Sequence, residues 1–482
     1  MTILCHDQKI SFNFGRLLAI CAVCVAALPV TAAWADSHAR IVRLSDVQGS
    51  VQMSHGAGEK LSRAFINLPL VEGSHIKTGP DGRAEVEFED GSTLRLAPQT
   101  EVDFSRLSLA DDGSKLNTAQ LLSGMVYANV HADVHGKKGG NKSGDEFILN
   151  FARDSVSVPD AAHFRLAIDG TNHATLAVFR GKCSAKLPSG QFDVPDKHSA
   201  AIQFSDDTVE NETAQSDGSA TDKTVAAKDD LAKNNLLIAK NYASQPSDEW
   251  DRQQSEYHDH NASTTTASKL GSPYVYGMSD LNYYGNFMNV PGYGNVWQPF
   301  LTGANWSPFQ DGGWAFYPGA GYNWVSGYQW GWMPYHYGTW AFAPGYGWFW
   351  QPGLWNSYAT MPQVVNAPKT VKLPIAPTVG RQTTIVGRGL TVNPAGGMIK
   401  VMTIAPGSAG FGVPRGSVEH LNNIAKKVDR TSRPITIAAA PPVPLSPTPA
   451  GFPQSGARGV PSSGASSVGN AHRSSGVPPR AH

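Results

Sequence analysis

Three acidic residues occupy every second position of one segment, and paired carboxylates of this kind can act as acid and base in glycoside hydrolysis. They are Glu85, Glu87 and Glu89. The residues that alternate with them are apolar: Ala84, Val86 and Phe88. Because successive side chains of a strand point to opposite faces, the alternation predicts a strand with a solvent-exposed acidic face. We therefore predict no catalytic role for these acids and no enzyme activity for the chain.

Histidines and a glycine-rich loop raise the question of a metal or phosphate site. His131, Asp133 and His135 would share one strand face, and His258–His260 follow a predicted helix. Such spacing alone is weak evidence for a metal, so we interpret both groups as solvated polar surfaces. The loop 136–143 lacks the glycine that a phosphate-binding loop carries before its lysine, and a strand follows it. We predict no metal, no cofactor and no catalytic residue.

The segment 273–358 is the most unusual part of the chain, because it holds ten of the twelve tryptophans. Its only charged residues are Asp280 and Asp311. Without Lys or Arg to meet phosphates, nucleic acid is not an expected partner. The tryptophans recur at intervals of roughly eight to ten residues, closed by Gly or Pro, which is typical of short repeated strands and turns. The segment is predicted to form a small, turn-rich β module.

Two interpretations of these aromatic residues remain open. Buried tryptophans could supply the core of a module that contains few Leu, Ile or Val residues. Alternatively, exposed Trp and Tyr faces could stack on sugar rings and bind cell-wall polysaccharide or peptidoglycan. The candidate residues for such a platform are Trp330, Trp332, Tyr335, Trp340, Trp348 and Trp350.

The first 35 residues have the pattern of an export signal. Basic residues precede an apolar run over residues 17–30, and Ala33 and Ala35 fit the small-x-small rule for signal peptidase, with cleavage before Asp36. The run is shorter than the roughly 20 apolar residues of a membrane span. We therefore predict a cleaved signal and export to the periplasm, cell surface or medium, with a retained anchor as the alternative.

Cys183 is the only cysteine that follows this predicted signal. One thiol cannot form an internal disulfide, so the folded part must be held by its hydrophobic core. Cys183 lies in a segment with strand-like alternation of apolar residues, which favours a buried, unreactive thiol.

Residues 36–204 show a period of two over many short segments, which predicts a mainly β domain of sandwich, barrel or solenoid-like form. Within it, glycines recur at turns between the segments, and Asp90-Gly91 fits the turn of a hairpin. This spacing resembles the FecR domain family, through Gly49-x-Val, Leu70-x-x-Gly73-x-x-Ile76-x-Thr78-Gly79-x-x-Gly82-x-Ala84, Asp90-Gly91-Ser92-x-Leu94-x-Leu96 and Leu121-Leu-Ser-Gly124-Met-Val126.

The resemblance implies an envelope or secreted β domain that binds something. Founding members of the FecR family are periplasmic parts of anti-sigma regulators, but this chain shows neither a cytoplasmic arm nor a downstream membrane helix, so that mechanism is not expected to carry over. Residues 270–358 in turn resemble an uncharacterised bacterial module that often follows FecR-like domains in secreted proteins. Neither resemblance transfers a ligand-binding residue to this chain.

The remaining segments are predicted to be connectors. Residues 205–228 are small and polar, which is typical of a flexible linker. Residues 229–258 are predicted to be a helical spacer, with one helix from Asp229 to about Ala243 and a second after Ser247 as N-cap. Residues 359–482 are rich in Pro, Gly and Ser and carry 13 Lys or Arg against two acids. This composition predicts a disordered basic tail with one short helix over residues 418–428.

The sequence as a whole therefore indicates an exported, non-enzymatic envelope protein. It contains 39 basic and 39 acidic residues, so its formal net charge is zero and no overall positive potential would attract a polyanion. Our main hypothesis is that it binds a cell-wall glycan or a protein partner, with envelope contact through the basic tail. The alternative is a component of envelope sensing, regulation or surface assembly in which the aromatic module is purely structural. A secreted hydrolase is the third interpretation.

Overall fold

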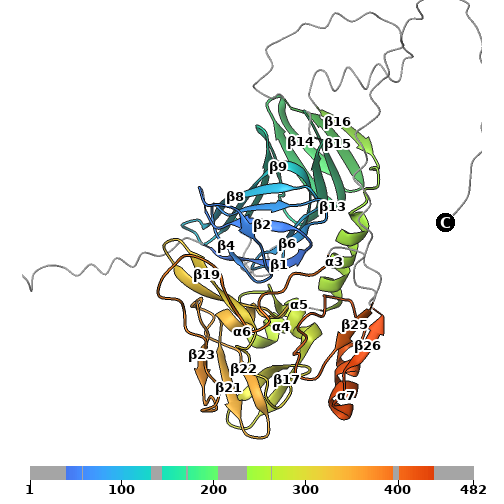
Figure 1. Cartoon of the computed structure of the whole chain (residues 1–482). Coiled ribbons are helices and arrows are strands. Elements are labelled where there is room, and N and C mark those ends of the chain that lie inside the picture. The colour runs from blue at the N-terminus through green and yellow to red at the C-terminus, as the bar shows by residue number, and fades with distance from the viewer. Residues whose placement is uncertain are drawn as a thin grey trace, which may run out of the picture.

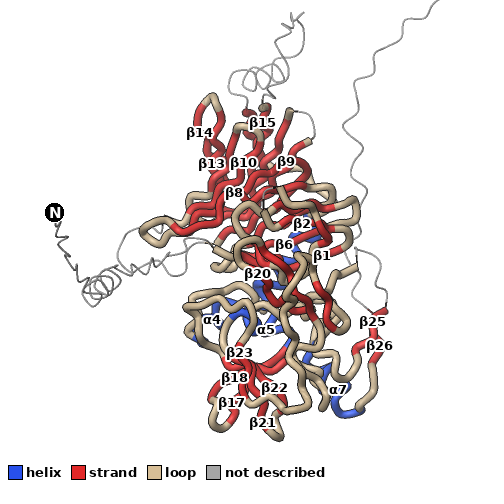
Figure 2. Tube along the Cα trace, turned by 60° about the vertical axis from the view of Figure 1, so that its left-hand side comes forward, coloured by secondary structure: helices blue, strands red, loops and turns tan. Residues whose placement is uncertain are grey.

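The computed structural model describes residues 40–56, 58–131, 144–169, 172–204, 236–261, 263–394 and 401–438. The fold is mainly β, as predicted, and consists of a strand-rich domain followed by a module with more turns and short helices (Figures 1 and 2). The predicted signal, the linker 205–228, the candidate residues Asp133 and His135 and the loop 136–143 lie outside the described residues. Throughout the described ranges, no helix is both long and apolar enough to span a membrane.

The first part is a domain whose sixteen strands join into one continuous, folded-over sheet. The strands are β1 (Val42–Gln48), β2 (Val51–Ser54), β3 (Ser62–Arg63), β4 (Pro69–Leu70), β5 (His75–Thr78), β6 (Arg83–Glu87), β7 (Thr93–Leu96), β8 (Glu101–Leu109), β9 (Lys115–Val130), β10 (Glu146–Phe151), β11 (Asp154–Ser157), β12 (Ala162–Ile168), β13 (His173–Leu187), β14 (Gly190–Pro195), β15 (His198–Gln203) and β16 (Leu236–Lys240).

Two long strands connect the halves of this sheet. The first part of β9 pairs with β8 and β10, whereas its second part, from Gly124, pairs with β7 and β12. Strand β13 changes partners in the same way at Gly181. Both glycines have positive φ, and a Cβ at Gly124 would lie 2.5 Å from the carbonyl oxygen of Gln99, so only glycine fits the bend. Side chains from both halves share one apolar core.

Strand β6 differs from its sequence-based prediction. The apolar residues of β6 face the core of the domain, as expected. The acidic face was predicted to be exposed, but Glu85, Glu87 and the following Glu89 are all buried. The prediction was wrong because the second part of the chain packs on this face. For example, the amide of Val275 donates to the carbonyl of Glu89 at 2.7 Å.

The predicted helical spacer is only partly helical. Residues 236–240 form strand β16 and pair with β15, so the helix predicted from Asp229 to Ala243 is wrong for these residues. The open edge of β15 supplies backbone partners that an isolated helix would not have, and Leu236 enters the core. The second predicted helix is confirmed as α3 (Asp248–His260), with its apolar face buried, although the Ser247 side chain makes no capping hydrogen bond.

The second part of the chain contains short helices and three small sheets around an aromatic core. Its helices are α4 (Ser263–Leu270), α5 (Met278–Tyr284), α6 (Met333–His336) and α7 (Leu421–Thr431). Its strands are β17 (Gly285–Val290), β18 (Gly294–Pro299), β19 (Gly312–Tyr317), β20 (Gly321–Ser326), β21 (Thr339–Ala343), β22 (Gly347–Gln351), β23 (Gln363–Val365), β24 (Thr384–Val386), β25 (Val401–Ile404) and β26 (Ile435–Ala438).

The predicted tail begins later in the chain than expected. Described elements continue from β23 to β26, and the predicted short helix is confirmed as α7. Strand β23 pairs with β21, and β24 pairs with β19, so these segments complete the sheets of the aromatic module. The prediction of a tail is therefore wrong for residues 359–394 and 401–438, and residues 439–482 lie outside the described residues.

Candidate functional site

The junction between the β domain and the aromatic module contains a buried network of charged side chains. Its centre is Glu85, which is completely buried on β6. One carboxylate oxygen accepts hydrogen bonds from Ser45 at 2.7 Å and Arg415 at 2.7 Å, and lies 3.0 Å from the imidazole of His258. The other oxygen accepts from Arg95 at 2.8 Å. Four chain segments therefore meet at one carboxylate.

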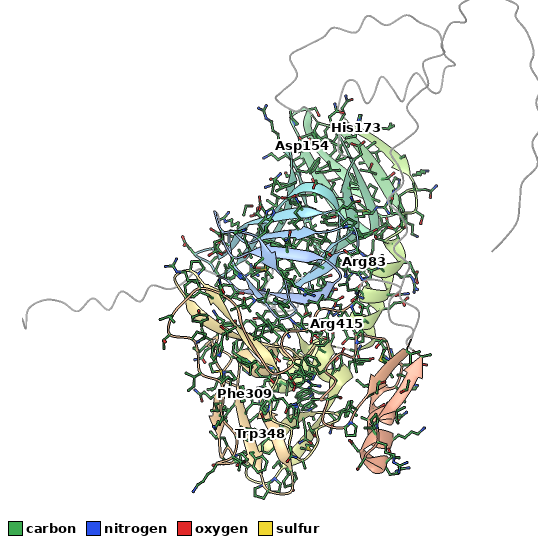
Figure 3. All side chains as sticks on the ribbon, viewed as in Figure 1. Arg83, Asp154, His173, Phe309, Trp348 and Arg415 are labelled. Atoms are coloured by element: carbon green, nitrogen blue, oxygen red, sulfur yellow. The ribbon has the colours of Figure 1, made fainter. Side chains whose placement is uncertain are left out.

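A second carboxylate, Asp280 on α5, connects this network to the module. Arg415 donates to both of its oxygens, at 2.8 and 2.7 Å, and Arg43 lies 2.6 Å from it. The hydroxyl of Tyr257 donates to it at 2.8 Å. Arg415 thus bonds to one acid of each part of the chain, and Figure 3 shows it at the boundary between the two parts.

The helix α3 adds a third group of buried charges. Asp251 lies on its inward face and accepts from Arg95 at 2.6 Å, while His163 of β12 lies 2.7 Å from the same carboxylate. Nearby, the guanidinium of Arg83 lies 5.2 Å from the ring of Trp250, within the range of a cation–π interaction. These contacts attach α3 to the β domain.

The protonation behaviour of the network follows from burial and neighbouring charge. Burial alone would raise the pKa of Glu85, but His258, Arg95 and Arg415 outweigh it and hold the pKa well below its ordinary value. Asp280 behaves in the same way, because Arg415 and Arg43 lower its pKa against the effect of burial. These carboxylates are therefore charged, and both oxygens of each accept hydrogen bonds. Such an arrangement fixes the geometry of the junction and does not suit proton transfer.

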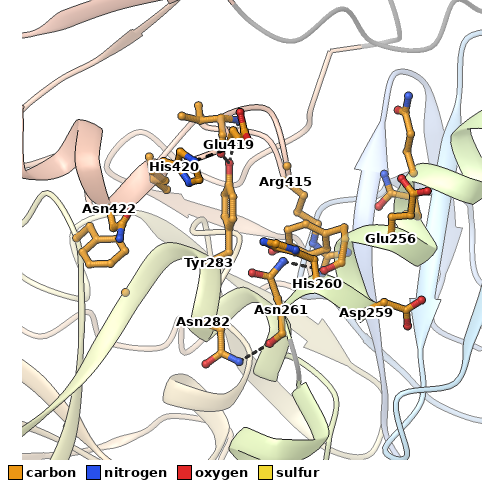
Figure 4. A pocket seen from close by; sticks show the side chains of 18 of the residues that line it. Glu256, Asp259, His260, Asn261, Asn282, Tyr283, Arg415, Glu419, His420 and Asn422 are labelled. Atoms are coloured by element: carbon orange, nitrogen blue, oxygen red, sulfur yellow. Dashed lines mark hydrogen bonds and ion pairs between the residues drawn. The ribbon is translucent and has the colours of Figure 1, made fainter.

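A cleft lies beside this network. It has a volume of about 1120 Å³ and is formed by the second half of α3, the junction of α5 and β17, and the segment 415–422. Figure 4 shows Tyr283 between the segment that carries Glu419 and His420 and the side chain of Asn282. Arg415 belongs both to the wall of this cleft and to the buried network.

The six aromatic residues proposed as a platform are brought together, but in the core of the module. None exceeds 3% exposure: Trp330, Trp332, Tyr335, Trp340, Trp348 and Trp350. The Trp330 ring packs against those of Tyr335 and Trp340, with centroids 5.9 and 6.1 Å apart. Their buried faces cannot stack on a sugar, so the core interpretation accounts for them and the exposed platform does not.

Cys183, His131 and His258, which the sequence offered as candidate site residues, are buried or partly buried in the fold. Cys183 is buried, as predicted, and burial raises the pKa of its thiol. His131 is partly buried beside the β6–β7 turn, where its backbone amide donates to Ser92 at 2.9 Å. His258 contacts Glu85 in the network instead of lying on a solvated surface. Within the described part of the chain, no three His, Cys, Asp or Glu side chains are grouped to hold a metal.

The sequence-based reasoning missed the network as a unit. One signal was present, since Asp280 and Asp311 are the only charges of an otherwise uncharged aromatic segment. An acid in such surroundings is expected to need a buried partner. Both acids have one: Asp280 pairs with Arg415, and Asp311 pairs with Arg388. Both arginines lie in the segment that was predicted to be a tail, so the sequence around them gave no indication that they pair with buried acids.

Comparison with known families supports the two-part organisation. Residues 74–184 match the model of the family described as FecR protein. Residues 278–379 match a family of unknown function (DUF6600). The resemblance inferred from the turn glycines, and the presence of an uncharacterised module after the FecR-like domain, are thereby confirmed.

Two solved structures from Parabacteroides distasonis, each described as a proposed anti-sigma factor, are similar to part of the chain. The one at 2.50 Å resolution is 17% identical, with a TM-score of 0.22, over 27% of this chain and 54% of its own length. The one at 1.65 Å is 14% identical, with a TM-score of 0.22, over 38% of this chain and 90% of its own. The chain thus spans about half the length of the first. No curated protein matches the chain.

Proposed function

We propose that this protein is an exported, non-enzymatic component of envelope sensing or regulation. In this proposal the FecR-like domain and the aromatic module act as one body, and the cleft between α3, α5 and residues 415–422 receives the signal. The FecR match supports the regulatory assignment, and the export pattern of residues 1–35 supports the location.

One observation carries the proposal: Arg415 lines the cleft and also bonds to Glu85 of the FecR-like domain and Asp280 of the module. A ligand that displaces Arg415 would change the contacts that hold the two parts together. Because each buried charge requires its own partner, the network favours one relative orientation of the parts. A change at the cleft is thereby coupled to the orientation of the FecR-like domain.

The experiment is complementation of a deletion strain, with genome-wide transcript levels as the readout. We expect deletion to alter transcripts of envelope genes, and we expect the full chain and Arg433→Met, a change at an exposed arginine, to restore them. The chain lacking residues 1–35 and the Arg415→Met variant should not restore them, even when expression is adjusted so that immunoblots give each protein the abundance of the full chain.

Two outcomes would overturn the proposal. Full restoration by the chain without residues 1–35 would place the action inside the cell. Unchanged transcripts together with altered wall fragments in the deletion strain would favour the hydrolase interpretation.

A further inference from the structure

The cleft beside the buried network has the size of a ligand site. Its volume of about 1120 Å³ slightly exceeds the roughly 300–1,000 Å³ typical of small-molecule pockets. Three segments that are distant in sequence form it, namely α3, the α5–β17 junction and residues 415–422. An extended ligand of a few rings would touch all three segments at once.

A buried polar group in the cleft wall has no hydrogen-bond partner among the residues that the structure describes. Gln254 lines the cleft and is only 8% exposed, and its side-chain carbonyl oxygen accepts no hydrogen bond. An unpaired buried acceptor costs about 1–3 kcal/mol of folding free energy. Because this oxygen is closed to solvent, a ligand with a hydroxyl or N–H donor would satisfy it after the Gln254 side chain turns toward the cleft.

The charges of the wall select against anions. Three carboxylates line the cleft, from Glu256, Asp259 and Glu419. The only guanidinium among the lining residues belongs to Arg415, and its donors are already bonded to Glu85 and Asp280. Apart from the imidazoles of His260 and His420, the described residues of the wall therefore offer no unpaired cationic side chain to a phosphate or carboxylate. Hydroxyl, amide and ammonium groups, in contrast, find acceptors.

Aromatic and amide side chains complete the wall. Tyr283 and Phe300 line the cleft, and the Tyr283 hydroxyl is held by a hydrogen bond of 2.9 Å to the carbonyl of Val418. The amide side chain of Asn286 is exposed at the start of β17, within the same wall. Ring faces combined with amides and carboxylates suit a molecule with apolar C–H faces and many donors around its edge.

We infer that this cleft binds a short glycan whose sugars carry hydroxyl groups and either acetamido or free amino groups. The inference rests on the proposed function, which it deepens by naming the ligand class of the sensing cleft. The aromatic residues involved are those of the cleft wall, and the buried tryptophans serve only as the core beneath it.

Titration calorimetry with purified residues 36–482 tests the inference. The probes are the trimer of N-acetylglucosamine, its de-N-acetylated form, and maltotriose as a sugar without nitrogen. We expect binding of the first two and weaker binding of maltotriose. Asn286→Ala should weaken binding about fivefold, the loss of one hydrogen bond. Asn289→Ala, an exposed residue of the same strand that does not line the cleft, should bind normally.

The Gln254→Leu variant distinguishes a glutamine that contributes to sugar binding from one that only stabilises the fold. Because the change removes an unpaired buried acceptor, we expect a higher midpoint of thermal unfolding together with weaker sugar binding. A lower midpoint would show that Gln254 has an internal partner and would remove this part of the argument.

The inference is overturned if none of the sugars binds or if Asn286→Ala binds as unsubstituted residues 36–482 do. It is also overturned if a lysine-containing tripeptide, tested as a fourth probe, binds in place of the sugars. These results concern the purified protein and leave the transcript experiment unaffected. Failure of the glycan inference can therefore be distinguished from failure of the sensing proposal.

Discussion

Arg415 shows how one side chain can connect two parts of a protein. Its guanidinium bonds to Glu85 and Asp280, both of which are completely buried, and an uncompensated buried carboxylate is costly. Burial would lower its pKa, but the two acids raise it well above the ordinary value, so Arg415 stays charged at every relevant pH. Arg415 therefore provides positive charge to both of these acids.

We expect Arg415→Met to lower the free energy of unfolding by about 3–5 kcal/mol, because it leaves two buried acids short of a cation. Urea unfolding of residues 36–482 measures this. Arg433→Met, at an exposed arginine, should change it by less than about 0.5 kcal/mol. The double variant Arg415→Met with Glu85→Gln should regain part of the loss. Equal effects of the Arg415 and Arg433 changes would contradict the importance of the network.

His336 should make stability dependent on pH. Its ring is buried against Tyr358, and its Nδ1 donates to the carbonyl of Ala359 at 2.9 Å. Burial lowers its pKa from 6.5 to about 4. Between these values the unfolded chain binds a proton that the folded chain does not, so stability decreases as the pH falls from 6.5 to 4. The decrease amounts to about 3 kcal/mol for a shift of this size.

The variant His336→Asn keeps a donor for Ala359 but cannot be protonated, so this contribution to the pH dependence should disappear. Urea midpoints between pH 7.5 and 4.5 provide the measurement. His420→Asn is the control, because that imidazole is 67% exposed. An unchanged slope for His336→Asn would mean that the ring is accessible to protons in the folded state.

At the scale of elements, strand β6 is buried on both faces although its sequence alternates. Its apolar side faces the core of the β domain, and its acidic side meets α3, α5 and the segment of Arg415. A strand with one charged face is normally exposed on that face. Here the partners of the charges come from up to 330 residues away in sequence.

The segment 401–438 is the second element whose role depends on distant contacts. Helix α7 buries Leu421, Ala425 and Val428, and the indole of Trp330 donates to the carbonyl of Ala409 at 2.8 Å. Each large apolar side chain buried in this way contributes about 1.5–3 kcal/mol. The segment is therefore part of the module and not an appended tail.

Truncation tests this conclusion. Removal of residues 401–482 should expose the aromatic core, seen as a red shift of tryptophan emission and rapid proteolysis. Removal of residues 439–482 should leave emission and proteolysis unchanged, because every described contact is retained. If both truncated chains keep the native emission spectrum, residues 401–438 do not contribute to the module.

At the scale of the whole molecule, the network and backbone contacts join the two parts into one unit. Beyond the charged groups, Asn67 of the β domain donates to the carbonyls of Ser326 and Tyr328, at 3.1 and 2.6 Å. The hydroxyl of Tyr317 donates to the carbonyl of Pro69 at 2.8 Å. We therefore expect the two parts to unfold together.

The sequence provides one probe for each part. Ten of the eleven tryptophans of residues 36–482 report on the module, and the eleventh is Trp250 of α3. Cys183, the only cysteine of residues 36–482, reports on the β domain. In a urea series, the midpoint of tryptophan emission and the midpoint of Cys183 labelling by a thiol reagent should coincide. Separate midpoints would show that the parts fold independently, and the proposed coupling through Arg415 would lose its basis.

The sequence by itself determined the local features of this protein. The period of two and the turn glycines specified the FecR-like β domain, and the spacing of the tryptophans specified a turn-rich module. The short helices α3 and α7 also followed from local pattern. These features depend on neighbours within a few residues, which is the range that periodicity reports.

Only the tertiary structure decided which polar faces are exposed. Glu85 and Glu87 follow the pattern of a solvated face, yet they are buried, because the second part of the chain covers them. Arg415 of that part pairs with Glu85, and Arg43 of the β domain itself pairs with Glu87. The tryptophans could have been core or platform until the packing placed them inside. Burial depends on contacts between residues far apart in sequence, and local alternation carries no information about such partners.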